Sequence, residues 1–194
     1  MTQFEDLVRN NRSCRRFHQN HRIEVKTLKS LVNLARLSAS GANLQPLKYI
    51  LACNSEINER IFSCLAWAAY LKDWNGPEEG ERPSAYIVIL GDTEISKTFG
   101  CDHGIAAQSI LLGARANGLA GCMIGSVKRK KLQEILEIKS RFEILLVIAI
   151  GEPKEKARLE AVGPDGNIKY WHDNDKIHHV PKRNLNELII ESIE

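Results

Sequence analysis

The chain has 194 residues, of which 43% are hydrophobic and 26% are charged, and this composition excludes a disordered or fibrous protein. The net charge is only +3 and the basic residues are spread along the chain, so a nucleic-acid-binding surface is only weakly supported, whereas local recognition of an anion remains open. Five widely spaced cysteines with no Cys-x-x-Cys pair argue against a disulfide framework and against a zinc ribbon.

No segment is predicted to target or cross a membrane. The N-terminus leads directly into a charged amphipathic stretch, and the longest strongly apolar run, residues 144–150, is far too short to span a bilayer. Together with cysteines that have no predicted partners, these features predict a cytoplasmic protein with a single domain over residues 1–194.

The N-terminal helix, predicted over residues 2–10, leads into a basic turn. Phe4, Leu7 and Val8 have helical spacing, and three arginines and a serine follow within residues 12–16. Two interpretations of this turn are equally supported: a solvated charge run, or a site for a phosphate monoester, because guanidinium groups offer paired donors to phosphate oxygens.

Residues 24–37 are predicted to form a helix with one apolar stripe, and residues 49–53 a buried strand. The stretch between them, residues 38–46, combines small, turn-forming residues with two side-chain amides. Such a segment presents polar groups to a ligand in many proteins, although plain connectors have the same composition.

Residues 54–71 are predicted to be helical, with a surface loop over residues 73–83 and a second apolar strand over residues 85–90. The bulky side chains Trp67, Tyr70 and Trp74 are expected to pack in the core or an interface rather than to cover a substrate. A helix that is apolar on almost all sides, residues 104–117, is expected at the centre of the domain.

The strand predicted over residues 119–126 is rich in glycine. Its spacing and position do not match the Rossmann dinucleotide fingerprint, so its glycines serve either the close approach of a flat ligand or a bend in the strand. A basic amphipathic helix over residues 127–138 and a continuous apolar strand over residues 142–150 follow, and the strand is expected in the middle of the sheet.

The tail is predicted to contain a turn at residues 163–166, a strand at residues 168–171 and a last helix that begins after Asn184. His178 and His179 are adjacent, so their side chains diverge, and no other spacing supports a chelating set. No metal site is therefore predicted.

Three separated pieces carry a family resemblance: Arg12-Ser13-x-Arg15, Ser40-Gly41-x-Asn43-x-Gln45-Pro46 and Gly118-Leu119-x-Gly121, followed by Pro181-Lys182-Arg183. With this order and spacing, the chain resembles the FMN-dependent nitroreductase family along nearly its whole length. The resemblance implies an α+β fold with a mixed, largely antiparallel central sheet flanked by helices, and a C-terminal extension that reaches the partner subunit.

The resemblance also implies an activity and an assembly. The protein would take a hydride from NADH or NADPH and pass it to a small electron-poor acceptor, such as a nitroaromatic or a quinone, by a ping-pong mechanism. It would be a homodimer with FMN at the subunit interface, and no side chain is assigned as catalytic because the chemistry would be carried by the flavin N5.

One group of residues would hold the phosphate end of the cofactor. Carried over by position, Arg12, Ser13 and Arg15 would bind the FMN phosphate and ribityl chain, and Lys182 or Arg183 would close on the phosphate from the C-terminal side. A second group, Ser40, Asn43 and Gln45, would meet the flavin of the partner subunit.

A third group lies on the glycine-rich strand. The strand, which includes Gly121, would place main-chain N–H groups around Gly125 and Ser126 near the N5 and O4 edge of the flavin. The sequence departs from the family at Leu47, where an aromatic residue is often found, and at Gly125, where some members carry glutamate.

Three other functions remain open from the sequence. Related branches fragment reduced flavin or dehalogenate aromatic substrates, and they share the flavin-binding pieces. A non-catalytic flavin-binding protein is a second alternative, and a basic nucleic-acid binder, based on residues 12–16 and 128–131, is a third.

Overall fold

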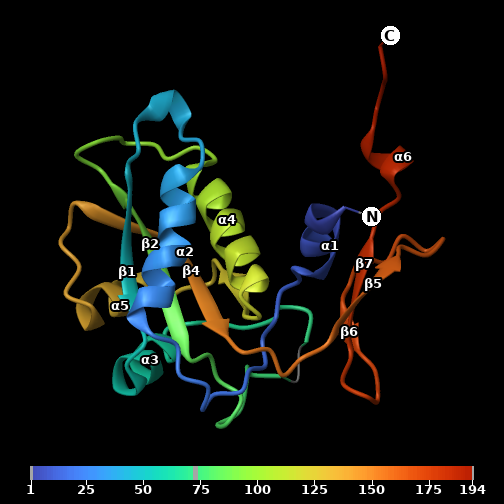
Figure 1. Ribbon diagram of the computed structural model, residues 1–194, viewed down its shortest axis with the longest axis horizontal. Coiled ribbons are helices and arrows are strands. Elements are labelled where there is room, and N and C mark those ends of the chain that lie inside the picture. Colours follow the sequence, from blue (N-terminus) through green and yellow to red (C-terminus); the bar gives the residue numbers. More distant parts are fainter. Residues whose placement is uncertain (1, 72–73, 194) are drawn as a thin grey trace.

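A computed structural model describes residues 2–71 and 74–193 and has a four-stranded central sheet (Figure 1). All of its neighbouring strands pair antiparallel. Across the sheet the strands follow the order β1 (Leu47–Ala52), β2 (Ala85–Asp92), β4 (Phe142–Gly151) and β3 (Ala120–Ile124).

Helices cover both faces of this sheet. Two long helices, α2 (Val25–Leu37) and α4 (Asp102–Ala116), share one apolar cluster with the first face. Side chains of α3 (Ser55–Phe62) and α5 (Arg129–Ile135) share a second cluster with the other face. The short helix α1 (Gln3–Asn10) lies beside α4, as Figure 1 shows.

Strand β2 explains why the central strands are continuously apolar. Ile87 and Ile89 belong to the cluster under α2 and α4, whereas Tyr86, Val88 and Leu90 belong to the cluster under α3 and α5. Because successive side chains of a strand point to opposite faces, a strand that is covered on both sides needs an apolar residue at every position.

The C-terminal segment forms a separate ribbon beside α1 (Figure 1). Its three short strands have the order β5 (Ala157–Ala161), β7 (His178–Lys182) and β6 (Trp171–His172), with β5 and β7 parallel. A single turn of helix, α6 (Leu185–Leu188), begins at the predicted Asn184 capping box and is followed by an extended stretch that points away from the domain.

The α+β class and the interior position of β4 are confirmed, and the prediction of a largely antiparallel sheet holds. The only parallel pairing among residues 2–71 and 74–193 lies in the C-terminal ribbon. The central helix predicted over residues 104–117 is present as α4, and Gly118 just beyond its end has an αL conformation with φ +73°. In the part of the chain that the structure describes, no helix combines the length and apolar character needed to cross a membrane.

The prediction of a helix over residues 54–71 is wrong for the residues after Phe62. Helix α3 ends at Phe62, and the chain then runs along the segment that follows β3, with Ala66 N–H donating to the Ser126 carbonyl at 3.0 Å and Lys128 N–H to the Cys64 carbonyl at 2.8 Å. These tertiary hydrogen bonds replace the i to i−4 bonds that the apolar spacing alone predicted. The predicted loop over residues 73–83 begins outside the described residues, and its described part ends at β2.

Three other predicted elements are shorter than expected. The helix predicted over residues 127–138 spans only α5, and the first helix begins at Gln3. Of the strand predicted over residues 168–171, only Trp171 lies in a strand, β6. Such differences arise where the ends of an element depend on the partners that it meets.

Candidate functional site

The basic turn after α1 lines a cavity of about 270 Å³. Arg12, Ser13 and Arg15 contribute to its wall from the N-terminal side, and Lys182 and His178 contribute from β7. The pairing of β7 in the C-terminal ribbon therefore brings together basic residues that are about 170 positions apart in the sequence. Three cationic side chains and one hydroxyl around one cavity suit a phosphate group.

Arg12 has the strongest requirement for a ligand. Its Nη2 donates to the Val8 carbonyl in the last turn of α1 at 2.8 Å, but its buried Nε has no hydrogen-bond partner among the described residues. Burial also lowers the pKa of Arg12, although a guanidinium stays charged at neutral pH. A buried cationic donor without a partner is costly, and an anion in the cavity would remove that cost.

Arg15 joins this cavity to a second one. Its backbone N–H donates to Glu155 Oε2 at 2.8 Å, and its Nη1 lies 3.3 Å from His178 Nε2. Its guanidinium carbon lies 4.9 Å from the centre of the Tyr170 ring. Burial lowers the pKa of His178 to about 4, so its imidazole is neutral at physiological pH and accepts the hydrogen bond from Arg15.

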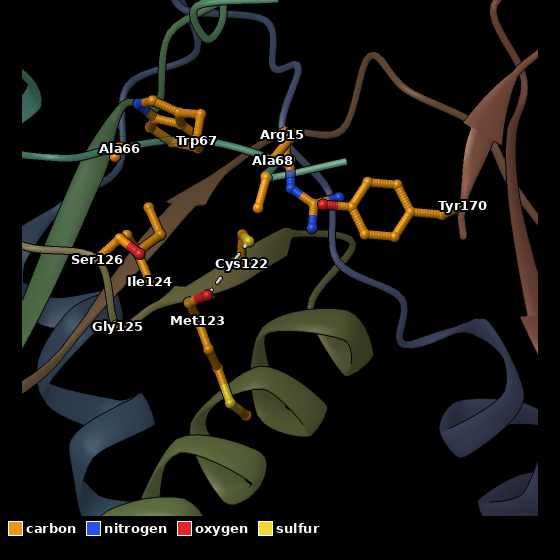
Figure 2. Close-up of a pocket in the computed structure, with 11 residues that line it drawn as sticks. Arg15, Ala66, Trp67, Ala68, Cys122, Met123, Ile124, Gly125, Ser126 and Tyr170 are labelled. Atoms are coloured by element: carbon orange, nitrogen blue, oxygen red, sulfur yellow. Dashed lines mark hydrogen bonds between the residues drawn. The ribbon is translucent and has the colours of Figure 1, made fainter. Parts of the chain in front are cut away.

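The second cavity has a volume of about 230 Å³ and lies at the C-terminal end of β3 (Figure 2). Gly125 and Ser126 form part of its wall, and Trp67 lies on another side. Arg15, Met123 and Tyr170 line both cavities, so the two are adjacent parts of one larger site. Figure 2 shows the Arg15 guanidinium beside the Tyr170 ring.

The two glycines assigned to this region from the family resemblance have different surroundings. A Cβ on Gly121 would lie 2.4 Å from the Ala149 carbonyl oxygen of β4 and 2.6 Å from Leu111 Cδ2, so close packing between β3, β4 and α4 requires glycine there. A Cβ on Gly125 would meet no atom of the described residues within 4 Å. Gly125 lines the second cavity, and Gly121 lines neither of the two.

The loop of residues 38–46 is held by the first turn of α4. Asp102 accepts hydrogen bonds from Ser40 Oγ at 2.6 Å and from Gly41 N–H at 2.9 Å, and Ser40 Oγ in turn accepts from Gln45 N–H at 2.9 Å. Ala42, Asn43 and Gln45 all have a positive φ, between 47° and 55°. Non-glycine residues in this conformation are strained, and such strain is concentrated at functional sites.

A third cavity of about 210 Å³ adjoins this loop, with Ser40, Gln45, Tyr49 and Asp102 in its wall. It shares no lining residue with the other two cavities. Figure 1 places the loop beyond the N-terminal end of α4, away from the C-terminal ribbon. Within one chain, the loop is therefore separate from the basic turn.

The structure brings together one part of the residue set that the family resemblance implies. Arg12, Ser13, Arg15 and Lys182 line the first cavity, and Gly125 and Ser126 join Arg15 in the second. Arg183 lines neither of the two and lies 3.5 Å from Glu187. The loop residues Ser40, Asn43 and Gln45 line neither of these two cavities.

Tyr170 and His178 are additional cavity residues that the sequence did not reveal. Tyr170 lines both cavities and His178 lines the first, yet neither belongs to a recognisable local motif. Both reach the site through the C-terminal ribbon, whose pairing has no signal in the local hydrophobic pattern. Trp67, expected to pack in the core, is largely buried and also forms a wall of the second cavity.

A model of the nitroreductase family matches residues 8–73 and 81–152, so the chain belongs to this family. It is 24% identical over 199 residues to MhqN of Bacillus subtilis, which has a provisional NAD(P)H nitroreductase name, covering 81% of this chain and 92% of the relative. The C-terminal ribbon lies beyond the residues that the family model matches.

Solved structures show the same fold. A nitroreductase family protein from Streptococcus pneumoniae superimposes with a TM-score of 0.68 at 18% identity, covering 84% of this chain and 96% of the other. An FMN-dependent nitroreductase from Clostridium difficile gives a TM-score of 0.64 at 22% identity, covering 87% of this chain and 97% of the other.

Proposed function

We propose that this protein is an FMN-dependent oxidoreductase that takes a hydride from NADH or NADPH and passes it to a small electron-poor acceptor, such as a nitroaromatic or a quinone, by a ping-pong mechanism. Membership of the nitroreductase family and the FMN-dependent Clostridium difficile structure support this class of reaction. The five unpaired cysteines are consistent with the cytoplasmic location that we propose.

The observation that carries the proposal is the buried Nε of Arg12, which has no partner among the described residues, in a cavity that also contains Ser13, Arg15 and Lys182. An FMN phosphate fits this donor set, because its oxygens can accept from two guanidinium groups, a hydroxyl and an ammonium group. The adjacent cavity, lined by Gly125, Ser126 and Trp67, would take the flavin ring.

FMN, when bound, supplies the hydride-accepting N5 of its ring. The chain would bind and orient the cofactor: Arg12 and Lys182 would hold its phosphate, and main-chain N–H groups around Gly125 and Ser126 would lie near the polar edge of the ring. Donors fixed in place before the reaction stabilise negative charge that develops on the ring.

We further propose that the protein acts as a homodimer in which Ser40, Asn43 and Gln45 serve the flavin of the partner subunit. The strained loop around Asn43 is separate from the basic turn within one chain, and a second copy would bring the two together. Exposed apolar side chains at the C-terminal end also favour burial against a partner, including Leu185 at 67% and Ile190 at 101% exposed.

The visible absorption spectrum of the purified protein tests the cofactor and the reaction together. We expect a bound-flavin spectrum, or saturable FMN uptake with a gain in melting temperature, followed by bleaching of the flavin bands when NADH or NADPH is added without oxygen. Recovery of the bands when a quinone or nitroaromatic is added would complete the cycle. The absence of bound flavin together with no thermal response to FMN would refute the proposal.

A further inference from the structure

A Glu–His–His cluster lies at the start of the C-terminal ribbon, outside the region that the family model matches. Glu155, His172 and His178 each place one potential ligand atom within 4.8 Å of the other two. Glu155 Oε1 and His172 Nε2 are already 2.8 Å apart. No metal site is predicted from the sequence, because the side chains of His178 and His179 are expected to diverge. They do diverge, but His178 meets Glu155 and His172, which come from two other segments of the chain.

The backbone of the ribbon holds these side chains together. His172 and His178 are directly opposite one another in the antiparallel pair β6 and β7, and opposite residues place their side chains on the same face. The His178 N–H donates to the Lys156 carbonyl at 2.8 Å, which fixes β7 beside the residue that follows Glu155. The cluster is therefore part of a hydrogen-bonded scaffold.

The carboxylate is also oriented from outside the cluster. Glu155 Oε2 accepts the Arg15 backbone N–H at 2.8 Å, which leaves Oε1 facing His172. A ligand oriented in this way by a second interaction is typical of metal sites. The Glu155 side chain is 1% exposed and that of His172 is 24% exposed, so the cluster is buried on one side and open on the other.

An unsatisfied ring nitrogen of His178 is an independent indication that the cluster binds a ligand. The residue is 1% exposed, and its Nδ1 is buried without a hydrogen-bond partner among the described residues. In a closed hydrogen-bonded cluster with a purely structural role, both ring nitrogens would be expected to have partners. One ring nitrogen of a buried imidazole is thus unsatisfied beside a carboxylate and a second imidazole.

We propose that Glu155, His172 and His178 bind a divalent transition-metal cation of the zinc class, with a water molecule in the fourth position on the exposed side of His172. Two imidazoles and one carboxylate form an established ligand set for zinc and for other first-row metals. Ligands of a tetrahedral zinc ion lie roughly 3.4 Å apart. The separations in the cluster, from 2.8 Å to at most 4.8 Å, bracket that value.

Metal binding would change the position of Arg15. If the metal takes His178 Nε2, the lone pair that now faces Arg15 Nη1 at 3.3 Å is used. If it takes Nδ1, the proton of the neutral imidazole moves to Nε2, and two donors would then face one another. In both cases Arg15 leaves His178 and becomes available to the adjacent cavities.

Zinc and FMN are expected to affect each other's binding, an expectation that rests on the proposed function. An FMN that draws Arg15 towards its own oxygens frees His178, and a metal that displaces Arg15 frees the guanidinium for FMN. The two ligands should therefore each tighten the binding of the other by the same factor. The metal would lie beside the cavity proposed for the FMN phosphate, because His178 lines that cavity.

The test uses the full-length protein without flavin, after treatment with a chelator that is then removed. Titration with ZnCl₂ in a calorimeter should show one zinc ion per chain, and CoCl₂ should give the visible absorption bands of four-coordinate cobalt. His172→Gln should weaken zinc binding by on the order of 10-fold or more. This variant is suitable because the His172 side chain is partly exposed, and circular dichroism would confirm that it folds.

His179→Gln is the matched control. His179 lies next to His178 but bonds Glu160 and Asp173 on the opposite side, at 2.8 and 3.0 Å, so zinc affinity should be unchanged. No saturable zinc binding by the wild-type protein, or equal affinity in wild type and His172→Gln, would overturn the metal site. Equal weakening in His179→Gln would place the ion elsewhere and would overturn it as well.

The coupling to the flavin has a separate readout. The Kd for FMN should fall when zinc is present, and Arg15→Ala should remove this effect while zinc still binds. Zinc binding without any change in FMN affinity would reject the coupling alone. Failure to bind FMN at all would contradict the proposed function without affecting the metal site, because zinc binding is measured on the flavin-free protein.

Discussion

Lys182 and Arg183 are consecutive basic residues with different surroundings. Lys182 lines the cavity that contains Arg12, whereas Arg183 faces Glu187 at 3.5 Å. Of the two residues proposed to close on the FMN phosphate, we therefore favour Lys182.

Replacing each of these residues by alanine tests this choice. Lys182→Ala should weaken FMN binding by about 10-fold, the equivalent of ~1.4 kcal/mol for one charge-assisted contact. Arg183→Ala should change the affinity by less than about 2-fold, because an exposed ion pair contributes little. Fluorescence titration with FMN measures both values, and a larger loss in Arg183→Ala would reverse the assignment.

Two glycines of the β3 region provide a second matched pair. Gly121→Ala would place a methyl group against the backbone of Ala149, which cannot give way as a side chain can, so we expect destabilisation by ~1–3 kcal/mol or more. Gly125→Ala would meet no described atom within 4 Å and should keep wild-type stability within about 0.5 kcal/mol. Urea denaturation compares the two, and an equally stable Gly121→Ala protein would contradict the close packing described for β3.

At the scale of elements, Glu81 ties the loop before β2 to two distant segments. Its carboxylate accepts from Arg16 Nη2 at 2.7 Å and pairs with Lys154 Nζ at 2.9 Å, while its carbonyl accepts from Phe17 N–H at 2.9 Å. The hydrogen bond from Arg16 is the main cause that lowers the pKa of Glu81 to about 2 from its ordinary 4.5. The charged form is therefore favoured in the folded state.

The stability contributed by Glu81 should depend on pH in a defined direction. The pKa of Glu81 is lower in the folded state than in the unfolded state, so its charged form stabilises the fold at every pH above the unfolded value. Glu81→Gln should therefore lower the free energy of unfolding by ~1.5–3 kcal/mol at pH 7. As the pH falls from about 4.5 towards 2, Glu81 of the wild-type protein takes up its proton first in the unfolded state, which stabilises that state. The difference in unfolding free energy between wild type and Glu81→Gln should therefore shrink. Urea denaturation of both proteins between pH 7 and pH 3 checks this, and a constant difference would contradict it.

At the scale of the whole molecule, we propose that a second copy of the chain completes the site. Arg12 and Lys182 lie in one cavity and the loop of Ser40 and Gln45 borders another. In this arrangement, each flavin site combines the basic turn of one subunit with the loop of its partner. A substitution in the basic turn and a substitution in the loop of the same chain would then affect two different sites.

Mixed dimers test this arrangement. Arg12→Ala and Asn43→Ala should each lose flavin binding at both sites of a homodimer. A dimer with one chain of each kind should have one site that carries both changes and one intact site, so co-expression with two affinity tags should restore about half of the wild-type flavin content. No recovery in purified mixed dimers, or full flavin content in Asn43→Ala alone, would refute a shared site.

Much of the fold can be predicted from the sequence, because most elements are specified by neighbouring residues. The apolar stripe of residues 25–37, the uniformly apolar residues 144–150 and the turn at Gly118 have local patterns that match the observed α2, β4 and αL cap. The extent of α3 could not be predicted, because its end is decided by hydrogen bonds to the segment around Ser126.

The basic turn and the strained loop are visible in the sequence as residue types, whereas only the tertiary structure decides their partners. The sequence by itself shows that Arg12, Ser13 and Arg15 have donors that suit a phosphate, but it supports a solvated charge run equally well. The folded chain places Lys182 rather than Arg183 at that cavity, adds Tyr170, and joins Glu155 to His172 and His178. Those contacts depend on the pairing of short C-terminal strands, and a pairing between residues far apart in sequence has no local hydrophobic period that could reveal it.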